Sequence, residues 1–211
     1  GYGGSYFEAL RELRPDHEWI NAGVGGNTVI NLLRRLDDDV FSHNPDGVFV
    51  MIGGNDAISW AQPKTRSYYQ QGQAIPEGIV TPEQFEAGMR DLLTRLNLAQ
   101  VLVWVALPPA EYNPAIVTTL RDYNARTQAG ARALNVPVLD LMAALTPPQI
   151  QERPPLDITY ILTIGGREKR GWDDYEGARA REGYTFSFDG VHFTPGAAQQ
   201  VAKLISDFID T

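Results

Sequence analysis

The sequence predicts a three-layer α/β/α sandwich around a parallel β-sheet. Strand-like and helix-like segments alternate along the chain, which is typical of parallel strands joined by crossover helices. The segment 48–52 is apolar throughout, as expected for a strand buried on both faces. With 211 residues, 43% of them hydrophobic, the chain can bury one substantial core, and we expect a single domain over residues 1–211.

Four segments have the composition of strands: 19–21, 48–52, 101–107 and 136–139. The first leads into a Gly-rich loop, and the third is stopped by Pro108 and Pro109. We therefore expect each of these two strands to end in a turn.

Apolar side chains at helical spacing fill the intervals between the strands. The expected helices cover 5–13, 29–36 after a cap at Asn27 or Thr28, 82–96, 112–134 and 195–208. Thr81, Pro82 and Gln84 combine an N-cap, a proline at the first helical position and a capping-box residue. Two segments, 58–80 and 154–187, do not fit the alternation, and we interpret them as insertions that either line an active site or form solvated loops.

Composition excludes several classes of protein. The chain has no Cys and three dispersed His, so no disulfide, no cysteine nucleophile and no metal site is expected. A net charge of −8, with no Lys/Arg run longer than a pair, argues against nucleic acid as a partner. No apolar stretch reaches the roughly 20 residues of a membrane-spanning helix.

A first polar cluster follows the buried strand directly. Gly53 and Gly54 allow a sharp turn there, and Asn55 and Asp56 come next, with the Asn55 amide as a hydrogen-bond donor at the edge of the sheet. Ligands bind beyond the carboxyl ends of strands in such sheets. A plain turn is the alternative interpretation, because Gly and Asn are common in turns.

A second cluster, residues 21–28, lies between an expected strand and an expected helix. Its backbone N–H groups at a helix start would suit an anion or an oxyanion. It does not match a dinucleotide-binding loop, because the third glycine of that motif would fall at Thr28. The chain also has no Walker-type sequence, so a phosphate-binding P-loop is excluded.

The third cluster precedes the last helix and contains Asp189 and His192. A carboxylate three residues before a histidine can fold back to accept the imidazole N–H, which leaves the other ring nitrogen as a base. A structural histidine is the alternative. His17 and His43 have no comparable setting, and we expect both at the surface or at a strand edge.

In this order and spacing, the three clusters resemble the blocks of the SGNH hydrolases, the GDSL family of esterases and lipases. The resemblance covers essentially the whole chain. It implies a flavodoxin-like sheet of about five parallel strands and ester hydrolysis through an acyl-serine intermediate. It further implies Gly26 (backbone N–H) and Asn55 (side chain) as oxyanion donors, His192 as general base and acid, Asp189 as its orienting partner, and no cofactor.

The nucleophile of that family, in a Gly-Asp-Ser motif, does not occur in the sequence. Gly1 and Tyr2 resemble the residues just after that motif, and Ser5 resembles a helix cap. We therefore expect the nucleophile a few residues upstream of Gly1, in a missing segment of about ten residues that comprises the first strand and its turn. The other serines have no comparable context, although Ser187 lies close to Asp189: Ser42, Ser59, Ser67, Ser187 and Ser206.

The sequence thus favours a serine esterase acting on a small ester, with a short acyl group or a sugar-borne acetyl group. Aromatic residues in the two insertions suit such a substrate but could equally be packing: Trp60, Tyr68, Tyr69, Trp172, Tyr175 and Tyr184. A non-catalytic ligand-binding domain of the same fold is the alternative if the chain starts at Gly1. A nucleotide-binding flavodoxin-like protein is a weaker third interpretation.

Overall fold

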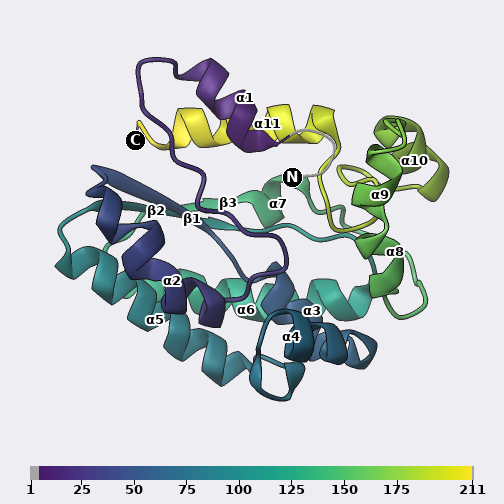
Figure 1. Ribbon diagram of the computed structural model, residues 1–211, viewed down its shortest axis with the longest axis horizontal. Helices are drawn as coiled ribbons and strands as arrows, with labels where there is room; N and C mark the ends of the chain where they lie inside the picture. The colour runs from purple at the N-terminus through teal and green to yellow at the C-terminus, as the bar shows by residue number, and fades with distance from the viewer. Residues whose placement is uncertain (1–4, 211) are drawn as a thin grey trace.

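The computed structural model describes residues 5–210, apart from the side chain of Tyr160, and forms three layers (Figure 1). The central sheet has the order β1 (Gly47–Met51), β2 (Leu102–Leu107), β3 (Val138–Asp140). All strands are parallel, with Val105 opposite Val50 on one side and Val138 on the other. The predicted α/β/α class and its parallel sheet are confirmed.

Helices cover both faces of the sheet (Figure 1). On one face lie α1 (Tyr6–Leu13), α7 (Leu141–Leu145) and α11 (Pro195–Phe208); on the other lie α2 (Val29–Asp39), α5 (Pro82–Leu98) and α6 (Pro114–Ala133). The shorter helices are α3 (Gly54–Ala61), α4 (Arg66–Gly72), α8 (Ile158–Leu162), α9 (Ile164–Glu168) and α10 (Tyr175–Glu182). Three 3₁₀ turns, Phe41–His43, Pro63–Thr65 and Pro76–Gly78, complete the described elements.

The core consists of two clusters separated by the sheet. Val103 and Val105 of β2 face the α2, α5 and α6 layer, whereas Ala106 faces α1 and α11. Leu93 belongs to the first cluster and Val201 to the second, and both side chains are fully buried. Burial of each such side chain contributes about 1.5–3 kcal/mol, and therefore both helical layers hold the sheet in place.

Side-chain caps fix the helix starts that the sequence predicts. The hydroxyl oxygens of Ser5, Thr81 and Thr194 each accept a backbone N–H of the first turn of α1, α5 and α11. At Thr81 the capping box with Gln84 is complete. These caps confirm the predicted boundaries and orient α11 directly behind the Asp189–His192 segment.

Some sequence predictions of local structure are wrong. Residues 19–21 form no strand with β1, β2 or β3; instead the Trp19 indole donates to the Arg14 carbonyl and its ring stacks on His17. The described residues contain three strands, compared with about five in the expected fold. The two insertions also contain helices: the first holds the second half of α3 and all of α4, and the second holds α8 to α10.

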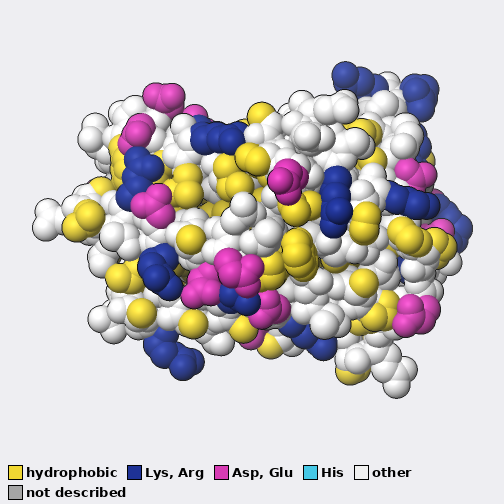
Figure 2. Space-filling view, turned by 90° about the horizontal axis from the view of Figure 1, so that it is seen from below, with side chains coloured by type: hydrophobic (Ala, Val, Ile, Leu, Met, Phe, Trp, Pro, Cys, Tyr) yellow, Lys and Arg dark blue, Asp and Glu magenta, His cyan; other side chains and the backbone are white. Residues whose placement is uncertain are grey.

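The face formed by α2, α5 and α6 carries charges of both signs interspersed with apolar side chains (Figure 2). On this face Arg126 of α6 pairs with Asp122, Glu83 and Glu86. Within residues 5–210, no helix is both long and apolar enough to cross a bilayer.

Candidate active site

Asn55 lies in the first turn of α3, directly beyond the carboxyl end of β1. Gly53 makes the turn into the helix with φ +121°, a conformation that L side chains rarely adopt, and a Cβ there would lie 3.2 Å from Phe85. The Asn55 amide donates through Nδ2 to the carbonyl oxygen of Asn27 at 3.0 Å. The predicted turn therefore exists, but it leads at once into a helix that carries the amide.

The orientation of the Asn55 amide is fixed by Tyr69 of α4. The buried Tyr69 hydroxyl donates to Asn55 Oδ1 at 2.9 Å. Burial, with smaller contributions from Tyr68 and Asp56, raises the pKa of Tyr69 well above its ordinary value, so the phenol stays protonated. Asn55 must therefore accept through Oδ1, and both N–H donors of its amide face away from Tyr69.

Gly26 lies in the loop between Ala22 and α2, with φ +80°. A Cβ at this position would lie 2.2 Å from the Tyr68 hydroxyl and 2.7 Å from Gln73 Nε2, and the positive φ disfavours any L side chain, so glycine is the residue that suits this turn. Asn27, the next residue, donates to Gln73 Oε1 at 3.0 Å. The segment around α4 thus packs against both predicted oxyanion donors, and Asn27 joins them because it also accepts from Asn55.

Arg35 of α2 holds the same loop from its other side. Its Nη1 donates to the Ala22 carbonyl at 2.7 Å, and its Nε donates to Asn27 Oδ1 at 2.9 Å. An ion pair with Asp39 keeps the guanidinium in place. Both ends of the Gly26 loop are therefore anchored to one side chain.

Asp56 connects the two clusters through a buried carboxyl group. Its Oδ1 accepts the N–H of Val29, the first residue of α2, at 2.9 Å. Oδ2 has no hydrogen-bond partner among the described residues. Burial raises the pKa of Asp56 to about 7, and the hydrogen bond from Val29 offsets only part of that effect.

Asp189 and His192 form the hydrogen-bonded pair that their spacing predicts. Asp189 Oδ2 lies 2.7 Å from His192 Nδ1, and Oδ1 accepts the N–H groups of Val191 and His192 at 2.9 and 2.7 Å. The Asp189 side chain is fully buried, while that of His192 is 33% exposed. A carboxylate held this way fixes the proton on Nδ1 and presents Nε2 as the basic nitrogen.

A short hairpin carries this pair. Phe188 N donates to the His192 carbonyl at 3.1 Å, Thr194 N donates to the Phe186 carbonyl at 3.0 Å, and the Phe188 ring stacks on the imidazole with centroids 6.0 Å apart. Gly190 makes the turn with φ +87°, and a Cβ there would lie 2.6 Å from the Tyr112 ring. We call residues 184–194 the His192 hairpin.

The two halves of the candidate site lie beyond the same edge of the sheet. Asn55 follows the carboxyl end of β1, and Tyr112, which contacts Gly190 of the His192 hairpin, follows the carboxyl end of the neighbouring β2. Because β1 and β2 are parallel, the four predicted residues Gly26, Asn55, Asp189 and His192 gather at one edge.

Sequence reasoning missed Glu111, a buried carboxylate in the same region. Oε2 accepts the N–H of Thr185 at 2.7 Å, while Oε1 accepts the N–H groups of Phe186 and Ser187 and the Ser187 hydroxyl at 3.0, 2.8 and 2.6 Å. The Ser187 oxygen in turn accepts Gly190 N at 3.0 Å. An acidic residue just after a buried strand was the only signal in the sequence.

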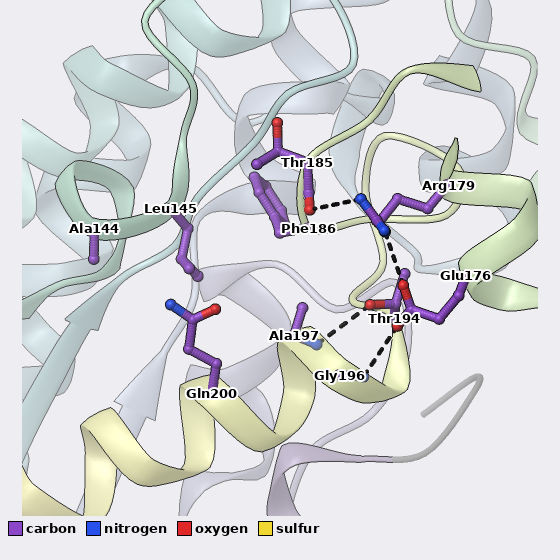
Figure 3. Close-up of a pocket in the computed structure, with 10 residues that line it drawn as sticks. All are labelled: Ala144, Leu145, Glu176, Arg179, Thr185, Phe186, Thr194, Gly196, Ala197 and Gln200. Atoms are coloured by element: carbon purple, nitrogen blue, oxygen red, sulfur yellow. Dashed lines mark hydrogen bonds and ion pairs between the residues drawn. The ribbon is translucent and has the colours of Figure 1, made fainter. Parts of the chain in front are cut away.

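The surface hollow in Figure 3 lies behind the His192 hairpin, between α7, α10 and α11. Arg179 pairs there with Glu176, and Glu176 accepts Gly196 N at the start of α11. Burial raises the pKa of Glu176, but its hydrogen bonds with Arg179, Thr194 and Gly196 N lower the pKa by more. The net pKa therefore falls below its ordinary value. The charged groups in this hollow are thus occupied with binding one another and the backbone.

Within the described part of the chain, no cluster of three or more His, Asp or Glu side chains could hold a metal ion. The Asp189–His192 contact is a hydrogen-bonded acid–base pair, an arrangement that suits general base and acid chemistry.

A model of the GDSL-like lipase/acylhydrolase family matches residues 2–199. The chain belongs to this family. Expectations for Gly1 and Tyr2 lie outside the described residues.

Several of the similar proteins are named as acetylxylan esterases. One from Geobacillus stearothermophilus is 35% identical over 74 residues, which is 35% of this chain and 30% of that protein. A crystal structure of the acetylxylan esterase Axe2 from the same organism superposes with TM-score 0.64 at 20% identity, covering 98% of this chain and 79% of the other. The acetyl xylan esterase AlAXEase gives TM-score 0.63 at 19% identity, covering 96% and 89%. At these identities the structures support the fold alone.

Proposed function

We propose that the protein is a serine esterase that hydrolyses carboxylic esters through an acyl-serine intermediate. The observation that carries this proposal is the Asp189–His192 pair, with Nδ1 2.7 Å from the buried carboxylate, at the sheet edge that also holds Gly26 and Asn55. Membership of the acylhydrolase family supports the same reaction class.

In the proposed mechanism, Nε2 of His192 removes the proton of a serine hydroxyl as it attacks the ester carbonyl. Asp189 stabilises the imidazolium that forms and does not itself take the proton. The backbone N–H of Gly26 and an amide N–H of Asn55 donate to the oxyanion, together with the N–H of the serine. His192 then protonates the leaving alcohol and activates water for deacylation. No step requires a metal or an organic cofactor.

We propose that the nucleophile is the serine of a Gly-Asp-Ser motif outside the printed sequence. The described serines have other roles: Ser5 Oγ accepts Phe7 N as a helix cap, Ser59 is buried and bonded to the backbone, and Ser187 is buried and donates to Glu111. The remaining described serines lie on the 3₁₀ turn after α2, on α4 and on α11: Ser42, Ser67 and Ser206. A solved relative described as a catalytic mutant replaces a serine by alanine, which supports a serine nucleophile.

For the substrate we propose an acetyl ester carried by a carbohydrate. The names of the acetylxylan esterase relatives support this class. Among the aromatic residues of the insertions, Tyr69, Tyr175 and Tyr184 are buried and serve packing, but Trp60 is 40% exposed. Trp60 borders a hollow of about 480 Å³ with Pro114 and the first turns of α6, where its ring could stack on a sugar.

The test is the intact mass of the natural protein before and after treatment with a serine-directed fluorophosphonate. One stoichiometric adduct, on a chain heavier than the printed sequence, is the expected result, and His192→Ala should abolish the adduct while the fold stays intact. A mass equal to that of the printed sequence and no adduct would favour the non-catalytic ligand-binding domain.

A further inference from the structure

The His192 hairpin is held at its base by the buried side chain of Glu111. Glu111 is 4% exposed and lies just beyond the carboxyl end of β2. Its two oxygens accept three consecutive backbone N–H groups, those of Thr185, Phe186 and Ser187, and the Ser187 hydroxyl. All four donors thus belong to the segment of the His192 hairpin that leads into Asp189.

These contacts require an ionised carboxylate. A carboxylate offers only acceptors, and hydrogen bonds to an ionised acceptor are about twice as strong as neutral ones. Among the described residues, no Lys or Arg forms an ion pair with Glu111, so the N–H groups of the hairpin are what compensates for its burial. The carboxylate and the hairpin therefore depend on each other.

The backbone carbonyl groups at the start of the same segment face Arg179 of α10 (Figure 3). Its Nη1 lies 3.4 Å from the Tyr184 carbonyl oxygen and 3.5 Å from that of Thr185. Glu111 thus binds the N–H groups and Arg179 the carbonyl groups of the hairpin base. This arrangement fixes the rotation of the segment about its own axis.

One hydroxyl extends the contact to the turn of the hairpin. Ser187 Oγ donates to Glu111 at 2.6 Å and accepts Gly190 N at 3.0 Å. Gly190 lies between Asp189 and His192, whose own hydrogen bond is 2.7 Å. A displacement of Glu111 would therefore be transmitted to the turn that brings these two side chains together.

We propose that Glu111 is a positioning residue that sets the geometry of the Asp189–His192 pair. It acts through the backbone of 185–187 and the Ser187 hydroxyl, and touches no substrate. The effect of Glu111 on the reaction rate rests on the proposed esterase function, whereas its effect on the geometry of the His192 imidazole does not.

The experiment compares the natural protein with Glu111→Gln, Ser187→Ala and the matched control Glu83→Gln, which changes an exposed carboxylate on α5. The readout is the His192 tautomer, from long-range ¹H–¹⁵N NMR with the imidazole neutral. A glutamine at 111 replaces one acceptor oxygen by a donor, which must then face a backbone N–H.

We expect His192 to carry its proton on Nδ1 in the natural protein and in the control. In Glu111→Gln the Nε2–H tautomer should rise at least about threefold, and kcat should fall about 10- to 100-fold with KM nearly unchanged, as for a small misplacement of a reacting group. Ser187→Ala should shift the tautomer in the same direction, by less.

An unchanged tautomer in a folded Glu111→Gln protein would overturn the proposal, even if the variant melts at a lower temperature. If Glu111→Gln fails to fold, Ser187→Ala decides, since it keeps the carboxylate and removes only the link to Gly190. A tautomer shift in a protein whose natural form hydrolyses no ester would uphold the positioning role and reject the esterase function.

Discussion

Asp56 should make the stability of this protein fall as pH rises through the weakly acidic range. Its pKa is about 7 in the folded protein, against an ordinary value of 3.8, because the carboxyl is buried. Between about pH 4 and pH 7 the folded state therefore keeps a proton that the unfolded state has released, and stability declines with rising pH across that window.

The magnitude follows from the size of the shift. About three pKa units at 1.36 kcal/mol each correspond to roughly 4 kcal/mol of unfolding free energy, fully present below pH 4 and lost above pH 7. The titratable groups that face Asp56 are the phenols of Tyr69 and Tyr123, whose pKa values burial raises, so both remain neutral throughout the window.

The assay is urea unfolding of the natural protein and Asp56→Asn at a series of pH values from 4 to 8. Asparagine keeps an acceptor for Val29 N and cannot ionise, so the difference in unfolding free energy between the two proteins should change with pH by up to about 4 kcal/mol. Asp91→Asn, at an exposed position on α5, controls for the loss of a surface carboxylate. A difference for Asp56→Asn that stays constant from pH 4 to pH 8 would refute the reasoning.

Three further outcomes test the site. Asn55→Ala should lower kcat about 10²- to 10³-fold, the usual effect of losing one oxyanion donor, and His192→Ala should lower turnover by orders of magnitude with the fold intact. Steady-state kinetics and circular dichroism check both variants, and unchanged turnover in both would exclude the mechanism. Gly26→Ala should lower the unfolding free energy by about 1–3 kcal/mol in urea unfolding, because its φ is +80° and a Cβ would lie against the Tyr68 hydroxyl. Equal stability of the variant and the natural protein would mean that the loop is free to move. Trp60→Ala should raise KM up to about tenfold for an acetylated oligosaccharide but not for a small aryl acetate, and an equal change for both would remove Trp60 from the sugar site.

The sequence was sufficient to predict the layers of the fold and the contact between Asp189 and His192. Apolar runs identified β1 to β3, capping residues located the starts of α5 and α11, and a three-residue spacing placed Asp189 against His192. All of these signals are local, because strand burial, helix caps and one-turn contacts depend on neighbours in the sequence.

The strand expected at 19–21 shows where local signals fail. A strand forms only if another strand supplies its ladder, and none of the three described strands pairs with this segment. Trp19 instead directs its indole N–H to the Arg14 carbonyl. The helices of the insertions were missed because α4 lacks a clean apolar period; its Tyr69 both packs in the core and bonds to Asn55.

The carboxylates that hold each half of the site could not be found by motif, since their partners are backbone groups far away in the sequence. Asp56 binds Val29 N, 27 residues earlier, and Glu111 binds Ser187 N, 76 residues later. Both follow a strand of the parallel sheet, at the edge where neighbouring strands end together. A carboxyl group at such an edge is buried by the loops that cross it, and the N–H groups of those loops are the donors within reach. Parallel topology therefore supplies buried carboxylates with loop backbone as partners. Gly26 and His192 lie on those loops, and Asn55 lies in the first turn of α3.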